Sequence, residues 1–193
     1  MTLIIRPPKL LFPSKIQVSF DSNFNEYKDG MIEWMHGYAK NNESYHRSNH
    51  GGYQSPDQFF REETFGQYLN RISEHMFTSL EEYGNGIRVS DHNLYLSNMW
   101  FNFNRKDNYN ITHTHPGCIV SGVLYVHTPE NCGEIVFIDP MAHNSSEIDE
   151  NISETYTPVE GEMILFPAHL PHRVEPNYSD DLRISVSFNI CAS

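Results

Sequence analysis

The chain has 193 residues, of which 38% are hydrophobic and 20% are charged. This length suffices for one domain with a full core, is short for two, and carries the composition of an ordinary globular domain. The formal charge of −12, with only 13 scattered lysines and arginines, argues against nucleic acid as a partner, because phosphate binding needs clustered basic side chains.

The N-terminal half has the pattern of two helices and little sheet. Residues 9–20 read as an opening strand, and residues 25–39 carry apolar side chains at helical spacing. Residues 41–55 are rich in Asn, Ser, Gly and His, which predicts a loop. Ser55 followed by Pro56 is typical of a helix N-terminus.

A second and longer helix is expected after Pro56. Its apolar stripe consists of Phe65, Tyr68, Leu69, Ile72, Met76, Leu80 and Tyr83. Gly84 and Gly86 are suited to ending it. Core packing is the simplest explanation of this stripe.

From about residue 88 the hydrophobic period changes to two, which indicates strands. Leu94 to Asn104 alternates, with Met99, Phe101 and Phe103 on one face and Asn98, Trp100, Asn102 and Asn104 on the other. Further strands are expected at 118–127, 133–138, 161–167 and 182–190. The polar, acidic segment 140–155 is expected to be a long mobile loop, of the kind that often acts as a lid.

Helices followed by a run of short strands predict an α+β, mainly β domain. We expect a single domain over 1–193, in which a helical support (1–90) packs on one sheet of a jelly-roll or cupin-like core (91–193). The three cysteines, Cys118, Cys132 and Cys191, are odd in number and widely spaced, so we expect buried free thiols.

Location follows from what the sequence lacks. No apolar run approaches the roughly 18 residues that span a bilayer. The N-terminus has no basic start, long apolar centre and small-residue cleavage site. We therefore expect a cytoplasmic protein with no membrane partner.

Three histidines form the most informative pattern in the chain. His113 and His115 are one residue apart, so on an extended segment both side chains point the same way. His172, from a distant part of the chain, could be the third ligand on one face of a metal ion. The other coordination positions would stay open for substrate and dioxygen. On spacing alone, exposed loop histidines are the alternative.

The last strand predicts an anion site near this metal. Arg183, Ser185, Ser187 and Asn189 share one face, while Ile184, Val186 and Phe188 share the other. An arginine that points into the core needs an anion, and its planar fork matches a carboxylate. A rim arginine paired with an acidic residue is the alternative. If the register continues past Pro116-Gly117, Ser121 and Tyr125 lie on the side of His113 and His115.

Taken in order, these motifs resemble the Fe(II)- and 2-oxoglutarate (2OG)-dependent oxygenases, in the prolyl-hydroxylase-like branch that includes small phage and bacterial members. The resemblance covers roughly residues 95–190. Its motifs are His113-Thr114-His115-Pro116-Gly117, Ser121-Gly122-Val123-Leu124-Tyr125-Val126, Gly133-Glu134-Ile135-Val136-Phe137, Pro158 to Pro167, Pro171 to Pro176 and Arg183 to Asn189.

The resemblance implies a double-stranded β-helix barrel with Fe(II) at its open end. His113, His115 and His172 would be the metal ligands, and Arg183 would bind the distal carboxylate of 2OG with help from Tyr125. We also expect Ser185 and Asn102 to contact this cosubstrate. The implied activity is that of a dioxygenase, which consumes 2OG and dioxygen and hydroxylates a protein side chain or small metabolite.

Position 115 departs from the usual family pattern of His-x-Asp or His-x-Glu. A neutral imidazole there makes the iron site one charge unit more positive. Asp139 or Glu134 could instead supply a carboxylate. Two other functions stay open: a three-histidine cupin-like dioxygenase that does not use 2OG, and a non-catalytic jelly-roll binding protein.

Overall fold

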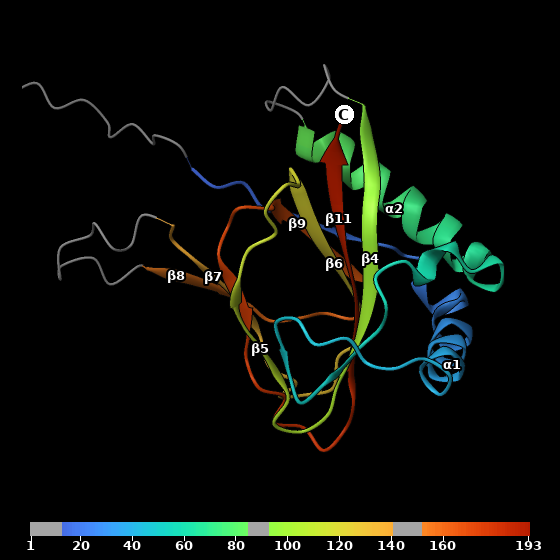
Figure 1. The fold of residues 1–193 in the computed structure, drawn as a ribbon. Helices are drawn as coiled ribbons and strands as arrows, with labels where there is room; N and C mark the ends of the chain where they lie inside the picture. The colour runs from blue at the N-terminus through green and yellow to red at the C-terminus, as the bar shows by residue number, and fades with distance from the viewer. Residues whose placement is uncertain (1–12, 85–92, 141–151) are drawn as a thin grey trace, which may run out of the picture.

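The computed structural model describes residues 13–84, 93–140 and 152–193. Its strands form two antiparallel sheets on opposite sides of the molecule's interior (Figure 1). The larger sheet consists, in spatial order, of β1 (Gln17–Phe20), β9 (Glu162–Pro167), β6 (Val120–His127), β11 (Arg183–Ala192), β4 (Leu94–Asn104) and β3 (Tyr53–Gln54). The smaller sheet consists of β2 (Asn49–His50), β5 (Tyr109–His113), β10 (His172–Val174), β7 (Ile135–Ile138) and β8 (Ser153–Tyr156).

Two helices, α1 (Lys28–Ala39) and α2 (Gly66–Gly84), lie on the outer side of the larger sheet (Figure 1). Short 3-10 turns flank them at Phe24–Glu26, Phe59–Arg61 and Glu63–Phe65. The α+β, mainly β fold with helices packed on one sheet is therefore confirmed. The two described sheets stay separate and do not close into one barrel.

The alternation in β4 and β11 separates a core from a polar interior, as predicted. Phe101 of β4 and Phe188 of β11 are fully buried on the helix side, together with Ile72 and Met76 of α2. A second apolar cluster lies between the sheets, made of Val123, Tyr125, Ile135, Phe137, Ile164, Phe166 and Leu170. The polar residues of β4 and β11 face this interior, where a ligand can reach them.

The prediction of a helix cap at Ser55 is wrong. Ser55 is buried and pairs with β4: its N–H donates to the Phe101 carbonyl at 2.9 Å, and its Oγ accepts from the Phe101 N–H at 3.0 Å. Helix α2 starts only at Gly66. Cross-strand pairing, which the local pattern does not reveal, outweighs the Ser-Pro signal.

Short strands also occupy parts of the two segments that the sequence predicts to be loops. Residues 41–55 contain the short strands β2 and β3. Residues 153–155 of the segment expected to be a lid belong to β8 (Ser153–Tyr156). The rest of that segment, 141–151, lies outside the described residues, as do 9–12 of the expected opening strand and Gly86. Strands this short depend on pairing with distant partners, so their own sequences carry little signal.

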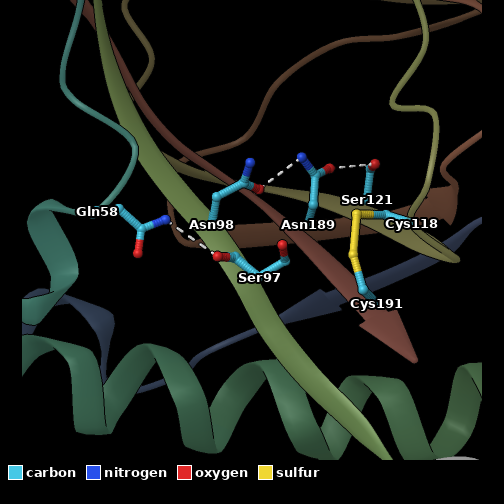
Figure 2. Close-up of a disulfide and its surroundings, with 7 residues drawn as sticks. All are labelled: Gln58, Ser97, Asn98, Cys118, Ser121, Asn189 and Cys191. Carbon is cyan, nitrogen blue, oxygen red and sulfur yellow. Dashed lines mark hydrogen bonds between the residues drawn. A yellow bond between two sulfur atoms is a disulfide. The ribbon is translucent and has the colours of Figure 1, made fainter. Parts of the chain in front are cut away.

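The prediction of three free thiols is wrong for two of them. Cys118 and Cys191 form a disulfide that links the turn after β5 to the end of β11 (Figure 2). The residues next to the two cysteines are also hydrogen-bonded: the Ile119 N–H donates to the Ile190 carbonyl at 2.9 Å. Strand pairing thus brings together residues that are 73 positions apart. Cys132 is a buried free thiol, as predicted.

In the described part of the chain, neither helix is long and apolar enough to cross a membrane.

Candidate metal centre and cosubstrate cavity

The three predicted histidines come together on the smaller sheet. His113 ends β5 and His172 begins β10, and the two are direct partners in the antiparallel ladder. His115 follows β5, and its N–H donates to the Ala168 carbonyl at 2.8 Å. The ring centroids are 4.3 Å apart for His113 and His172, 4.9 Å for His113 and His115, and 5.1 Å for His115 and His172.

The ring nitrogens are arranged as metal ligands. One potential ligand atom from each histidine lies within 4.8 Å of the others. Nδ1 of His113 is 2.8 Å from the Ile111 carbonyl, and Nδ1 of His172 is 2.9 Å from the Leu170 carbonyl. A ring nitrogen facing a carbonyl must carry the proton, so Nε2 of both rings keeps its lone pair for a metal.

Burial keeps these histidines neutral. It lowers the pKa of His172 to about 3 and that of His115 to about 4, with a further contribution from the neighbouring His113. The pKa of His113 is also lowered by burial. Neutral imidazole is the form that binds a metal, so the site can accept an ion near pH 7 without first losing protons.

A carboxylate does not join this cluster among the described residues. Glu134, one of the two alternatives, accepts a hydrogen bond from Thr157 at 2.7 Å. Asp139, the other, lies in a surface pocket beside Lys15 and Tyr156 rather than near the histidines. The predicted three-histidine set is therefore the arrangement that the fold brings together.

A cavity of about 50 Å³, here called the inner cavity, adjoins the three histidines. Its polar lining consists of Ser48, Asn102, Asn110, His113, His115, Tyr125, His172, Arg183, Ser185 and Ser187. This lining includes all the residues predicted for the three-histidine metal site and for 2OG binding. None of its described lining residues is an aspartate or glutamate.

Arg183 is the single guanidinium in this lining, and it is only 3% exposed. Its Nη1 donates to the carbonyls of Cys132 at 3.0 Å and Gly133 at 3.4 Å. Burial lowers its pKa, but the guanidinium is so strongly basic that it stays cationic. No described carboxylate lies within ion-pair distance of it. The predicted alternative of a rim arginine paired with an acidic residue is wrong.

The other three predicted residues offer polar groups to the inner cavity. Tyr125 is buried, and burial raises the pKa of its phenol, which therefore keeps its proton. Nδ2 of Asn102 is 3.5 Å from the hydroxyls of both Ser185 and Ser187. Its Oδ1 is buried without a hydrogen-bond partner in the described structure.

Sequence reasoning missed several lining residues. Nδ2 of Asn110 donates to Ser48 Oγ at 3.1 Å, and Ser48 Oγ lies 3.4 Å from Nε2 of His113. Both residues come from polar segments without a recognisable pattern. The ring of Trp100 is 5.7 Å from that of His115. The sequence could have indicated Trp100 as a lining residue, because it lies on the polar face of the predicted strand.

A second hollow of about 360 Å³, here called the outer cleft, adjoins His113 and His115. It shares Ser48, Trp100, His113 and His115 with the inner cavity. The rest of its lining is Arg47, Gln54, Asp57, Asn98, Ile111, Thr114 and Asn189. His113 and His115 thus line both hollows, whereas His172 lines only the inner cavity.

Residues 98–189 match the family model described as "Putative 2OG-Fe(II) oxygenase". This range includes the three histidines, Arg183, Tyr125, Ser185 and Asn102. The match spans 92 of the 193 residues, just under half of the chain, and over these residues the chain is similar to 2OG-Fe(II) oxygenases. A search of curated proteins finds no match.

Solved structures of 2OG oxygenases share the fold. A prolyl-4-hydroxylase of Pseudomonas putida is 16% identical with a TM-score of 0.61, covering 92% of this chain and 93% of that one. A prolyl hydroxylase of Trichoplax adhaerens, in complex with a hypoxia inducible factor peptide fragment, has a TM-score of 0.65 at 14% identity over 91% and 83% of the two chains. HygX of Streptomyces hygroscopicus, with nickel, 2OG and hygromycin B bound, has a TM-score of 0.61 at 12% identity over 92% and 83%.

These likenesses identify the pair of facing sheets as the double-stranded β-helix of the 2OG oxygenases. The predicted fold is thus confirmed, and the family match supports the predicted family. The family match also supports the predicted enzyme class, an oxygenase that depends on Fe(II) and 2OG. The roles of individual residues and the prime substrate are a separate question.

Proposed function

We propose that His113, His115 and His172 hold Fe(II), that Arg183 binds the distal carboxylate of 2OG, and that the protein hydroxylates a protein side chain or a small molecule. When bound, the iron and the 2-oxo acid supply the oxidising chemistry with dioxygen. The chain's own residues hold these groups, orient them and keep the inner cavity closed to bulk water.

The buried guanidinium of Arg183 is the observation that carries this proposal. A buried charge is costly unless an opposite charge or hydrogen bonds compensate it. Two backbone carbonyls satisfy part of the Arg183 fork, and no described acidic side chain lines the cavity. A carboxylate from a ligand would complete the arrangement in bidentate geometry.

The metal ligands fit the same cosubstrate. Imidazole suits Fe(II), and three ligands from one side leave positions for a 2-oxo acid and dioxygen. Three neutral imidazoles do not offset the ion's charge. The inner cavity would then hold a divalent ion and the cationic Arg183 with no protein anion, so it favours a dianion that can reach both.

Tyr125, Asn102 and Ser185 would orient the cosubstrate. The protonated phenol of Tyr125 can donate to a carboxylate oxygen. The two ends of an asparagine amide have nearly the same shape. Rotating the Asn102 amide by 180° about the Cβ–Cγ bond exchanges Oδ1 and Nδ2. The hydroxyls of Ser185 and Ser187 can then donate to Oδ1, while Nδ2 donates into the inner cavity.

Anaerobic addition of Fe(II) and then 2OG tests the proposal. We expect a visible metal-to-ligand charge-transfer band, which requires both groups in one site. Arg183→Ala should weaken 2OG binding by at least tenfold, because a hydrogen bond to a charged group contributes about 1.5–3 kcal/mol. His169→Ala is the matched control, since His169 is exposed three residues before His172. A well-folded, iron-loaded protein without the band would contradict the proposal.

The three-histidine ligand set also favours a second function, that of a dioxygenase that binds its substrate directly and needs no 2OG. Arg183 separates the two. Oxygen consumption without 2OG that Arg183→Ala leaves unchanged would support the second function. Dependence on 2OG that is lost in Arg183→Ala supports the first.

A further inference from the structure

We propose that Asn98 is a substrate-binding residue of the outer cleft, and that Asn189 and Ser121 hold its amide so that the N–H groups meet a carbonyl oxygen of the prime substrate. This inference rests on the proposed function, because it takes the outer cleft as the place where the prime substrate meets the metal. Asn98 would contact the substrate, and the other two would be positioning residues.

The three side chains form a row across three neighbouring strands. Asn189 of β11 is the direct partner of Asn98 in β4 and of Ser121 in β6. Residues that oppose one another in this way present their side chains to the same face of a sheet. Figure 2 shows the row, with Asn189 between the other two.

The hydrogen bonds give the row a direction. The Ser121 hydroxyl donates to Oδ1 of Asn189 at 2.6 Å, and Nδ2 of Asn189 donates to Oδ1 of Asn98 at 2.9 Å. Ser121 and Asn189 are 1% and 5% exposed, so their bonds are made away from solvent. A buried amide with an unpaired end is destabilised, which favours this full set of contacts.

The Asn98 amide is thereby left with its donor end available. Its Oδ1 is occupied by Asn189, while Nδ2 donates to none of the described residues. In Figure 2 the dashed line from Asn189 ends on the oxygen of Asn98 and not on its nitrogen. Asn98 is half-buried and lines the outer cleft together with His113 and His115. A donor pair fixed beside metal ligands is suited to orienting a substrate.

Strand β4 connects this donor to the cosubstrate cavity. Asn98, Trp100 and Asn102 lie on one face at successive two-residue steps, each about 6.8 Å along the strand. Asn102 lines the inner cavity, Trp100 lines both hollows, and Asn98 lines only the outer cleft. A substrate held at Asn98 would therefore lie on the opposite side of Trp100 from the cosubstrate.

The cleft indicates which oxygen Asn98 would bind. An N–H donor pairs with a carbonyl or carboxylate oxygen, and Asp57 and Arg47 both line the same cleft. These two opposite charges offset each other, so the side chains of the cleft give no excess positive charge that would select a carboxylate. We therefore assign a neutral carbonyl, such as that of an amide or ketone, as the group that Asn98 recognises.

Side-chain NMR tests the assignment with N,N-dimethylacetamide, which has a carbonyl acceptor and no N–H. The full chain, labelled with 15N at asparagine and tryptophan and supplied with Zn(II) and 2OG, would be titrated. We expect saturable shifts of the Asn98 amide signal, identified by its loss in Asn98→Asp, and of the Trp100 indole signal. Methylammonium, a donor-only probe, should leave the Asn98 signal in place.

Substitutions then separate binding from folding. Asn98→Asp can still accept from Asn189, but it replaces the donor by a charged acceptor. We expect it to weaken the dimethylacetamide response of Trp100 at least fivefold. Tyr95→Phe is the control, because Tyr95 lies on the same strand, is 48% exposed and lines neither hollow. Wild-type affinity in Asn98→Asp, or a preference of the wild type for methylammonium, would overturn the inference.

Asn189→Asp tests the positioning role. The carboxylate of this variant could accept from Ser121 but could not donate, so the Asn98 amide should turn and direct its N–H groups at that carboxylate. We expect the response to neutral dimethylacetamide to fall as in Asn98→Asp, which a purely structural role would not require. An unchanged response in a folded variant would refute this positioning role.

The Fe(II)–2OG band is measured separately, so that the two proposals can fail independently. Its absence refutes the proposed function, whereas a normal band with an unresponsive Asn98 refutes this inference alone.

Discussion

Nη1 of Arg183 donates to the carbonyl of Cys132 at 3.0 Å, so the turn before β7 holds the arginine of the inner cavity in place. The next residue, Gly133, has φ +83° and also accepts from Arg183. A side chain at Gly133 would collide with the carbonyls of Glu175 and Pro176. The conformation of this turn therefore depends on glycine, and the position of Arg183 depends on the turn.

Gly133→Ala should consequently lower both stability and cosubstrate affinity. We expect a loss of about 1–3 kcal/mol in the free energy of unfolding, from the strained φ and the collision. Urea unfolding and 2OG titration of the iron-loaded protein measure the two effects. Gly37→Ala is the control: it lies in α1 with no atom within 4 Å of a new Cβ, and should stabilise slightly. Unchanged 2OG affinity in Gly133→Ala would show that the turn does not position Arg183.

Loss of a histidine should abolish tight metal binding. Changes to groups that only orient metal ligands cost about 10–100-fold in affinity. Removal of a ligand in His113→Ala, His115→Ala or His172→Ala should therefore cost at least about 100-fold, measured by anaerobic titration. His115→Asp supplies an anionic oxygen in place of the imidazole, so we expect it to retain metal. If His115→Ala binds metal like the wild type, the site has only two protein ligands.

The sequence predicted His113 and His115 because their spacing is local, and His172 because the order of motifs resembles the oxygenase family. It could not predict how the three residues meet. The alternation in β4 and β11 placed Asn102, Arg183 and Ser185 on interior faces correctly, since strand periodicity depends on neighbouring residues. The pairing of His113 with His172 depends on the ladder between β5 and β10, two strands of five and three residues.

The errors share one physical cause. Cys118 and Cys191 meet across strands, and Ser55 pairs with Phe101 instead of capping a helix. Ser48 enters the site through its contact with Asn110. Each of these contacts joins residues that are far apart in sequence, and a one-dimensional pattern contains no information about which distant segments become neighbours.

The metal-free protein should lose stability in acid because its ligand histidines are buried in the neutral form. An unfolded histidine has a pKa near 6.5, whereas those of His115 and His172 are about 4 and about 3. Between these values the unfolded chain binds more protons than the folded one, so the free energy of unfolding falls as the pH falls from about 6.5 towards 3.

The pH dependence of urea unfolding measures this effect. We expect unfolding near pH 5 to take up roughly two protons at His115 and His172, in addition to those at carboxylates. Substituting either residue by asparagine should remove about one of the two. A proton uptake that neither substitution reduces would show that these imidazoles are not buried as neutral groups.

Tyr125→Phe should separate cosubstrate binding from stability. The Tyr125 hydroxyl forms no hydrogen bond with a described residue, although its ring packs in the apolar cluster between the sheets. Removing the oxygen should leave the free energy of unfolding unchanged or slightly higher. It should weaken 2OG binding about tenfold or more, because it removes a donor to a charged carboxylate.

Tyr156→Phe is the matched control, since Tyr156 packs against the same cluster but does not line the inner cavity. A loss of stability in Tyr125→Phe with normal 2OG affinity would mean that the phenol serves the fold and not the cosubstrate.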